Sequence, residues 1–189
     1  ITAVAHEHGL KVHMDGARLA NSVAALGCTP AEMTVKAGID VLSFGASKNG
    51  AFAAEAVVMF TPGLADEFAY RRKRGGHLFS KMRFLAIQFE TYLKDGLWLK
   101  MAGHANDCMK TLAQGLSEIG DVELLFPTNA NMLFARLPNT MIEGLRSAGF
   151  AFYDWPAEER SIIRLITAFN TDKADTEAFV AEARRLSNQ

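Results

Sequence analysis

The sequence predicts an α/β protein in which a mostly parallel sheet covered by helices is followed by a smaller α+β domain. Three observations predict this class. Short apolar runs alternate with helical stretches over residues 10–60, the pattern of parallel strands joined by helices. Apolar residues then recur at helical spacing over residues 79–93 and 97–119, which predicts two long helices. Beyond them, strand-like runs alternate with helical stretches, as in a small α+β domain.

Glycine and proline mark the boundaries of the elements expected in the first part of the chain. Gly27 and Gly38 suit helix ends, and Pro30 suits a first helical turn. Pro62 is expected to start a helix that carries the basic run 71–74. The other expected elements are a helix at 1–8, a strand at 10–14, helices at 18–26 and 30–37, and strands at 41–44 and 56–60.

The second part is expected to alternate strands and helices after the two long helical tracts. We place the domain boundary at residue 95, with a larger domain over 1–95 and a small α+β domain over 96–189. The expected strands are 122–126, 132–137, 151–155 and 162–167, and the expected helices are 141–148 and 172–186.

Composition excludes several classes of protein. Of the 189 residues, 49% are hydrophobic and only 22% are charged, so the chain can bury a core and is not disordered. A net charge of −1 disfavours sequence-independent binding of nucleic acid or of an anionic membrane. We therefore expect a small-molecule partner. The two cysteines, Cys28 and Cys108, are too few for a disulfide framework or a metal set, which indicates a reducing, cytoplasmic location.

The chain opens at Ile1 without a methionine, on what is expected to be the end of a helix. It has neither the basic start of a targeting peptide nor an uncharged window long enough to span a bilayer. We therefore expect it to be the C-terminal part of a longer soluble protein.

The most informative segment is HMDGAR, residues 13–18. Asp15 ends an apolar strand and precedes a glycine and a helix, a position where open α/β sheets contact their ligands. The alternative is an ordinary helix N-cap, which aspartate often provides.

A second strand end carries Lys48, in the run DVLSFGASKNG over residues 40–50. Small residues follow this lysine. Burial among them would lower the pKa of its amine, as a Schiff-base nucleophile requires. The alternative is a solvated lysine in a loop.

Together with a third segment, these motifs resemble a known family. HMDGARLANS, LSFGASKNG and IIRLITAFNT are similar to segments of the low-specificity L-threonine aldolases, which are pyridoxal 5′-phosphate enzymes with the aspartate-aminotransferase-like fold (fold type I). The resemblance covers most of the chain, as the C-terminal portion of such an enzyme, and the match of three motifs is far more specific than any one of them.

The resemblance implies a role for each matching residue. Asp15 corresponds to the carboxylate that pairs with the pyridine nitrogen, and Lys48 to the lysine that forms a Schiff base with the cofactor. Arg18 and Arg164 correspond to the arginines that bind the substrate carboxylate. Alternatively, Arg18 is a surface residue of a first helical turn, and Arg164 is an edge-strand charge facing water.

Further basic residues and the histidines give less specific indications of function. Arg74 and Lys81 lie roughly where the family carries basic residues near the cofactor phosphate; a solvated basic helix end is the alternative. His13 is expected to be a hydrogen-bonded histidine packed in the core. We find no metal-ligand spacing among the histidines and expect no metal site.

The implied reaction is cleavage of a β-hydroxy-α-amino acid, such as threonine or allo-threonine, to glycine and an aldehyde. A β-eliminating lyase or a glycine-handling transferase of the same fold, and a non-catalytic α/β fragment that binds a small acid, are the alternatives. The family also implies a homodimer or homotetramer. Because the family's stacking histidine and phosphate-binding loop are expected upstream of Ile1, we expect the 189-residue chain alone to be nearly inactive.

Overall fold

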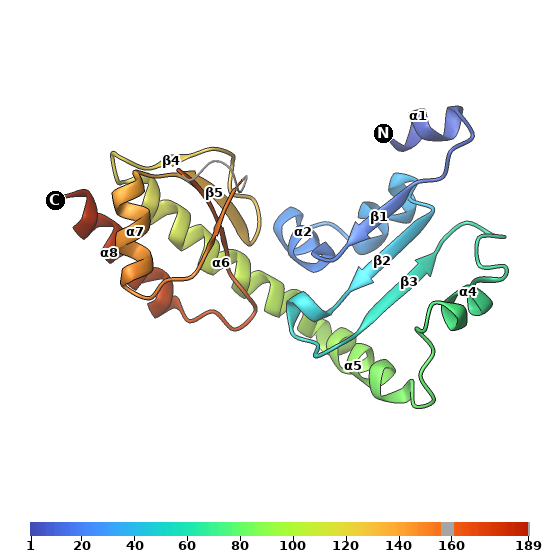
Figure 1. Cartoon of the computed structure of the whole chain (residues 1–189). Coiled ribbons are helices and arrows are strands. Elements are labelled where there is room, and N and C mark those ends of the chain that lie inside the picture. The colour runs from blue at the N-terminus through green and yellow to red at the C-terminus, as the bar shows by residue number, and fades with distance from the viewer. Residues whose placement is uncertain (156–160, 189) are drawn as a thin grey trace. The chain divides into compact units, whose positions relative to one another are not determined.

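The computed structural model describes residues 1–155 and 161–188 (Figure 1). The chain divides into two compact units, Ile1–Lys100 and Met101–Gln189. Each unit has a sheet of its own, and the two are described separately below.

The first unit contains three strands, five α-helices and three 3₁₀ turns before the start of a long helix. In chain order these elements are α1 (Thr2–Glu7), β1 (His13–Gly16), α2 (Leu19–Leu26), α3 (Pro30–Met33), β2 (Val41–Gly45), β3 (Glu55–Met59), α4 (Phe68–Arg74) and α5 (Arg83–Leu93), with 3₁₀ turns η1 (Val35–Ala37), η2 (Ser47–Asn49) and η3 (Lys94–Gly96) between them. The helix α6 (Leu97–Ser117) begins in this unit.

The sheet of the first unit has the strand order β1-β2-β3. Strands β1 and β2 are parallel, with Asp15 opposite Ser43. Strand β3 runs antiparallel to β2, with Val57 opposite Ser43. The segment between β2 and β3 is too short for a parallel crossover, so the chain must return antiparallel and the sheet is mixed.

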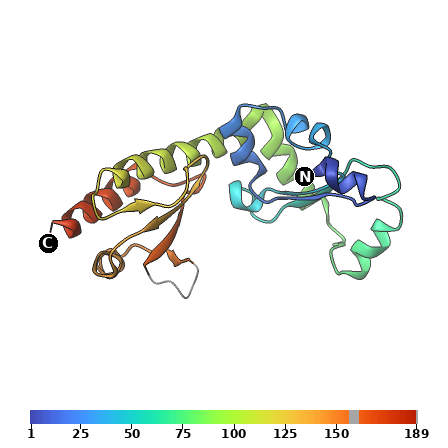
Figure 2. The same ribbon diagram turned by 90° about the horizontal axis from the view of Figure 1, so that it is seen from above.

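Side chains of β2 alternate between the two faces of this sheet. Leu42 is buried, and the Phe44 ring lies 5.5 Å from that of Phe89 in α5 and 5.8 Å from that of Trp98 in α6. The helices α2 and α5 lie on the same side of the sheet (Figure 2). Burial of aromatic surface on this side therefore holds the sheet against its helices.

Three expected helices differ in their boundaries. Pro62 does not start a helix: the chain turns there, and α4 begins only at Phe68, because Glu67 has a left-handed backbone with φ of 60°. The helix expected at 30–37 is interrupted at Thr34, whose φ and ψ of −119° and −95° are not helical. The helix expected from residue 79 begins at Arg83.

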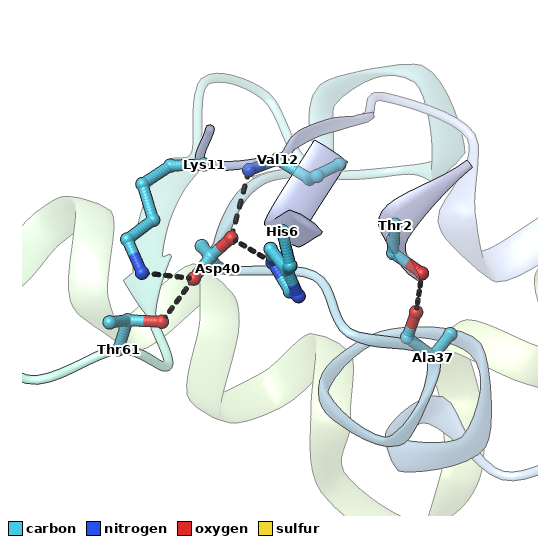
Figure 3. A network of polar contacts seen from close by, with 7 residues as sticks. All are labelled: Thr2, His6, Lys11, Val12, Ala37, Asp40 and Thr61. Atoms are coloured by element: carbon cyan, nitrogen blue, oxygen red, sulfur yellow. Dashed lines mark hydrogen bonds and ion pairs between the residues drawn. The ribbon is translucent and has the colours of Figure 1, made fainter. Parts of the chain in front are cut away.

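The buried carboxylate of Asp40 joins the amino ends of β1 and β2 to the carboxyl end of β3 (Figure 3). Its Oδ2 accepts hydrogen bonds from the Val12 amide and from His6 Nε2, both at 2.8 Å. Its Oδ1 accepts one from the Thr61 hydroxyl and lies 3.4 Å from Lys11 Nζ. These bonds, that of Thr61 foremost, hold the pKa of Asp40 far below its usual range.

The second unit packs helices on one face of a four-stranded antiparallel sheet. Its remaining elements are β4 (Glu123–Leu124), β5 (Met132–Arg136), α7 (Asn139–Ser147), β6 (Tyr153–Asp154), β7 (Ile162–Ile166) and α8 (Lys173–Ser187), with strand order β4-β5-β7-β6. The core residues Leu133 and Ile163 face Leu116, Leu145 and their neighbours from the three helices. The other face carries Arg164, which lies opposite Phe134 and Tyr153 in the register.

Within the described residues, no helix combines the length and the apolar character that a membrane span requires. The same residues contain no group of three His, Cys, Asp or Glu side chains arranged to hold a metal ion.

Candidate functional site

Asp15 lies at the carboxyl end of β1, one residue before the strand ends. Its side chain is exposed, and Oδ1 accepts a hydrogen bond of 2.9 Å from the Ala17 amide. That bond fixes the carboxylate at the entrance to α2. The residue that precedes α2 as its N-cap is Arg18, so the alternative of Asp15 as the helix cap does not describe this structure.

Glycine is required directly after Asp15. A Cβ at Gly16 would lie 2.5 Å from Leu42 Cδ1 and 2.7 Å from the Ser43 carbonyl oxygen. The close approach of β1 to β2 therefore depends on this glycine.

Lys48 lies in η2, the 3₁₀ turn that follows β2. Its side chain is exposed, whereas the next residue, Asn49, is only 2% exposed. The turn is closed by hydrogen bonds from the amides of Asn49 and Ala51 to the Ala46 carbonyl. Lys48 is thus accessible to solvent while its neighbour Asn49 is buried in the core.

Asp15 therefore lies at the carboxyl end of β1, and Lys48 follows the carboxyl end of the adjacent parallel strand β2. Because parallel strands end at the same edge of a sheet, the carboxylate and the amine emerge at one edge of the first unit. An anion and a primary amine at one sheet edge are the two groups that a pyridine aldehyde needs, since the anion pairs with a protonated ring nitrogen and the amine condenses with the aldehyde. The residues present thus fit pyridoxal phosphate.

His13 is exposed, so the expectation that it is packed in the core is wrong. Its Nε2 lies 2.7 Å from Ser43 Oγ, so the expected hydrogen bond is present. The period of two along β1 places His13 on the same face as Asp15, and in the first unit that face is opposite the one packed on α2 and α5.

The other basic residues singled out in the first unit lie on α2, on α4 and in the turn before α5. Arg18 is half-buried at the start of α2, three residues after Asp15. Arg74 is the last residue of α4 and Lys81 lies in the turn before α5, and both side chains are exposed.

Arg164 lies in the second unit, on the sheet face opposite the core. Its guanidinium carbon is 5.4 Å from the centre of the Tyr153 ring and 5.2 Å from that of Trp155, within cation–π range. Within residues 1–155 and 161–188, its buried Nε has no hydrogen-bond partner. Arg164 also lines a cavity with Phe152, Thr167 and Asp175. A buried donor next to a cavity suits an anionic ligand.

Several residues around the site were not singled out from the sequence. Ser47 and Glu55 hydrogen-bond to each other beside Lys48, at 2.7 Å, and Asn49 bonds to Tyr92. Only the position of Ser47 and Asn49 next to Lys48 signalled them. Glu55 and Tyr92 gave no local signal, because their partners are distant along the chain.

The model of the beta-eliminating lyase family, described as "Beta-eliminating lyase", matches residues 1–138.

Curated relatives confirm the predicted resemblance. The chain is 44% identical over 186 residues to a low-specificity L-threonine aldolase of a Pseudomonas species, covering 98% of this chain and 53% of that protein. It is 45% identical over 172 residues to the low-specificity L-threonine aldolase of Pseudomonas aeruginosa, covering 91% and 49%. The chain thus spans about half the length of the curated relatives it matches.

Solved structures confirm the fold class. The threonine aldolase of Leishmania major matches with a TM-score of 0.90 and 33% identity, over 98% of this chain and 54% of that one. The α-aminoadipate aminotransferase LysN of Thermus thermophilus, which was crystallised with N-(5′-phosphopyridoxyl)-L-leucine, matches with a TM-score of 0.66 at 14% identity, over 99% and 51%. The latter likeness shows the fold alone.

Proposed function

The chain belongs to the beta-eliminating lyase family, and on that premise we propose that it carries half of the active site of a pyridoxal-5′-phosphate-dependent aldolase. The reaction cleaves a β-hydroxy-α-amino acid of the threonine or allo-threonine type to glycine and an aldehyde. The observation that carries the proposal is the emergence of Asp15 and Lys48 at one edge of a parallel strand pair. The relatives named above, which are low-specificity L-threonine aldolases, support the reaction.

Asp15 and Lys48 would contact two different groups of the cofactor, its ring nitrogen and its aldehyde. The Lys48 amine would hold it covalently, and the Asp15 carboxylate, fixed by the Ala17 amide, would favour a proton on the ring nitrogen. When bound, pyridoxal phosphate supplies the electron sink for the pair released as the Cα–Cβ bond breaks. Arg74 and Lys81 are proposed to contribute positive charge near its phosphate.

Arg18 and Arg164 are proposed to bind the substrate carboxylate. A guanidinium meets a carboxylate through two parallel N–H donors and so defines the plane of the amino acid. Which bond at Cα breaks depends on its orientation to the cofactor ring, so a fixed carboxylate selects Cα–Cβ cleavage. In the overall reaction the β-hydroxyl loses its proton as the aldehyde forms, and Cα takes up a proton to give glycine.

The family description supports a second candidate, a β-eliminating lyase, which uses the same cofactor residues but releases ammonia. Aldehyde and ammonia release from threonine, measured side by side on the native polypeptide that carries this chain, distinguish the two. Aldehyde with equimolar glycine supports the aldolase; ammonia with a keto acid supports the lyase.

The cofactor assignment is tested by borohydride reduction in the presence of pyridoxal phosphate, followed by peptide mapping. We expect the pyridoxyl group on Lys48, and we expect Lys48→Ala to lose both this adduct and the absorbance band of the bound cofactor. Lys36→Ala, which removes another exposed lysine of the first unit, is the control and should retain both. An adduct distributed over surface lysines, with none enriched at Lys48, would overturn the assignment.

We also propose a homodimer or homotetramer in the cytoplasm. Both cysteines are free, Cys108 being buried, and this suits a reducing compartment. Light scattering of the native polypeptide tests the assembly, and a monomer at micromolar concentration would contradict it.

A further inference from the structure

The lysine at the sheet edge is flanked by two residues that are tied to different parts of the first unit. Ser47 donates its hydroxyl to Glu55 Oε1 of β3 at 2.7 Å. Asn49 points the other way, into the core, where it is 2% exposed. Lys48 itself is exposed between them. The position of its Cα is therefore set by its two neighbours.

Asn49 uses both hydrogens of its side-chain amide. Nδ2 donates to the Tyr92 hydroxyl oxygen at 2.7 Å and to the Trp98 carbonyl oxygen at 2.9 Å. These acceptors belong to α5 and to the start of α6, 43 and 49 residues away in sequence. Since an unpaired buried amide is costly, the side chain strongly favours the one turn geometry that makes both bonds.

The acceptors are rigid. Tyr92 and Trp98 are 4% and 8% exposed, their rings lie 6.3 Å apart, and both pack against Phe44 of β2. Burial raises the pKa of the Tyr92 hydroxyl, which therefore stays neutral at physiological pH. The two hydrogen bonds from Asn49 to Tyr92 and to the Trp98 carbonyl, which we call the Asn49 anchor, accordingly do not weaken with ordinary changes of pH.

On the side of the turn away from Asn49, the missing side chain of Gly45 makes room for Glu55 of β3. A Cβ placed on Gly45 would lie 2.7 Å from Glu55 Oε2 and 3.0 Å from Ala17 Cα. Glu55 thus reaches across β2, toward the residue that follows Gly16, because position 45 has no side chain. Its bond to Ser47 braces the turn from this direction.

We propose that Asn49 is a positioning residue for Lys48: through Tyr92 and the Trp98 carbonyl it fixes the 3₁₀ turn from which the amine reaches the cofactor aldehyde. This inference rests on the proposed function, because it assigns Asn49 a role at the same site. Asn49 does not itself touch the reacting atoms. It acts by restricting the backbone of Ser47–Asn49, so that the Lys48 side chain leaves the turn in one direction.

The first test measures the anchor without the cofactor, by hydrogen exchange of the Asn49 and Ala51 amides in the native polypeptide. Asn49→Ala should speed their exchange about tenfold, the effect of losing one typical hydrogen bond or more. Tyr92→Phe keeps the ring packing and should have a smaller effect. The double variant should exchange no faster than Asn49→Ala, because both changes break one connection.

Thr34→Val is the control, since it removes a buried hydroxyl hydrogen bond, 2.6 Å to the Pro30 carbonyl, elsewhere in the same unit. It should leave exchange in the turn unchanged. If amide exchange in the turn is unchanged in Asn49→Ala, or is accelerated equally by Thr34→Val, the Asn49 anchor does not hold the turn.

The second test follows the rate of pyridoxyl trapping on Lys48. We expect this rate to fall about tenfold in Asn49→Ala, in parallel with the exchange result, and turnover to show a lower kcat with little change in KM. Exchange that accelerates while trapping stays at the wild-type rate would overturn the positioning role and leave the proposed function standing. Absence of a Lys48 adduct in the wild type would overturn both.

Discussion

Arg164 places its guanidinium within cation–π range of two aromatic rings, those of Tyr153 and Trp155. The rings restrict a side chain that otherwise has many rotamers. Within the described residues its buried Nε has no hydrogen-bond partner, and Arg164 lines a cavity. Arginine suits this place better than lysine, because only a flat guanidinium stacks on rings and offers two parallel donors at once.

Arg164→Lys is therefore expected to lower kcat/KM for threonine cleavage by roughly ten- to a hundredfold, since hydrogen bonds to a charged group contribute about 1.5–3 kcal/mol. Steady-state kinetics of the native polypeptide measure this effect. Arg136→Lys, an exposed arginine of the same sheet that pairs with Glu123, is the control and should stay close to wild type. An unchanged kcat/KM in Arg164→Lys would remove Arg164 from the substrate site.

Among the elements, Asp40 ties the amino ends of β1 and β2 to the carboxyl end of the antiparallel β3, opposite the edge that carries Lys48. The folded-state pKa of Asp40 is depressed, so in the acid range the unfolded chain binds more protons than the folded one. The stabilisation is thus complete above the ordinary aspartate pKa, about 4, and is lost as pH falls toward the folded-state value.

We expect Asp40→Asn to lower stability at neutral pH and to flatten the loss of stability between about pH 5 and pH 2. Urea unfolding at a series of pH values measures both. Asp66→Asn, in the exposed turn before α4, is the comparison and should keep the wild-type slope. A wild-type slope in Asp40→Asn as well would show that other carboxylates govern the acid transition.

The helices of the second unit approach closely where small residues permit it. A Cβ on Gly115 of α6 would lie 2.7 Å from both Cγ atoms of Val180 in α8. Valine is stiff at χ1, so the helices must separate to admit a methyl group. Gly103, in the same helix, has nothing within 4 Å of such a Cβ.

Gly115→Ala is expected to destabilise the protein, because overpacking costs about 1–3 kcal/mol and outweighs the gain in helix propensity of about 1 kcal/mol. Gly103→Ala gains the propensity without the clash and should be neutral or stabilising. Thermal unfolding of both variants compares them directly. Equal stability of the two would mean that α6 and α8 adjust without strain.

On the scale of the whole molecule, Asp15 and Lys48 belong to one compact unit and Arg164 to the other. Each unit has its own sheet, and the second has a continuous apolar core of its own. The chain as a whole spans about half the length of its curated relatives.

We therefore expect the 189-residue chain, expressed by itself with added pyridoxal phosphate, to release little or no aldehyde from threonine. Circular dichroism recorded on the same sample establishes that the chain is folded. The native polypeptide that carries the chain provides the positive control. Robust turnover by residues 1–189 alone would contradict this expectation.

The sequence by itself determined the order of the elements and the strand-end location of Asp15 and Lys48, because both depend on local patterns. Apolar spacing predicted β2 and α6 closely, whereas the first strand was expected at 10–14 and is formed by His13–Gly16. The strand-end motifs correctly placed Asp15 and Lys48 at the carboxyl ends of β1 and β2. The start of α4 was missed, since a left-handed Glu67 has no sequence signature.

Only the tertiary structure decided what surrounds that pair. The face on which His13 lies, the reach of Glu55 across Gly45 and the bond from Asn49 to Tyr92 all depend on contacts between residues far apart in the chain. Local periodicity records whether a residue is buried or exposed. Which distant partner satisfies a buried polar group is settled only when the elements pack, because every such group must then find a donor or acceptor.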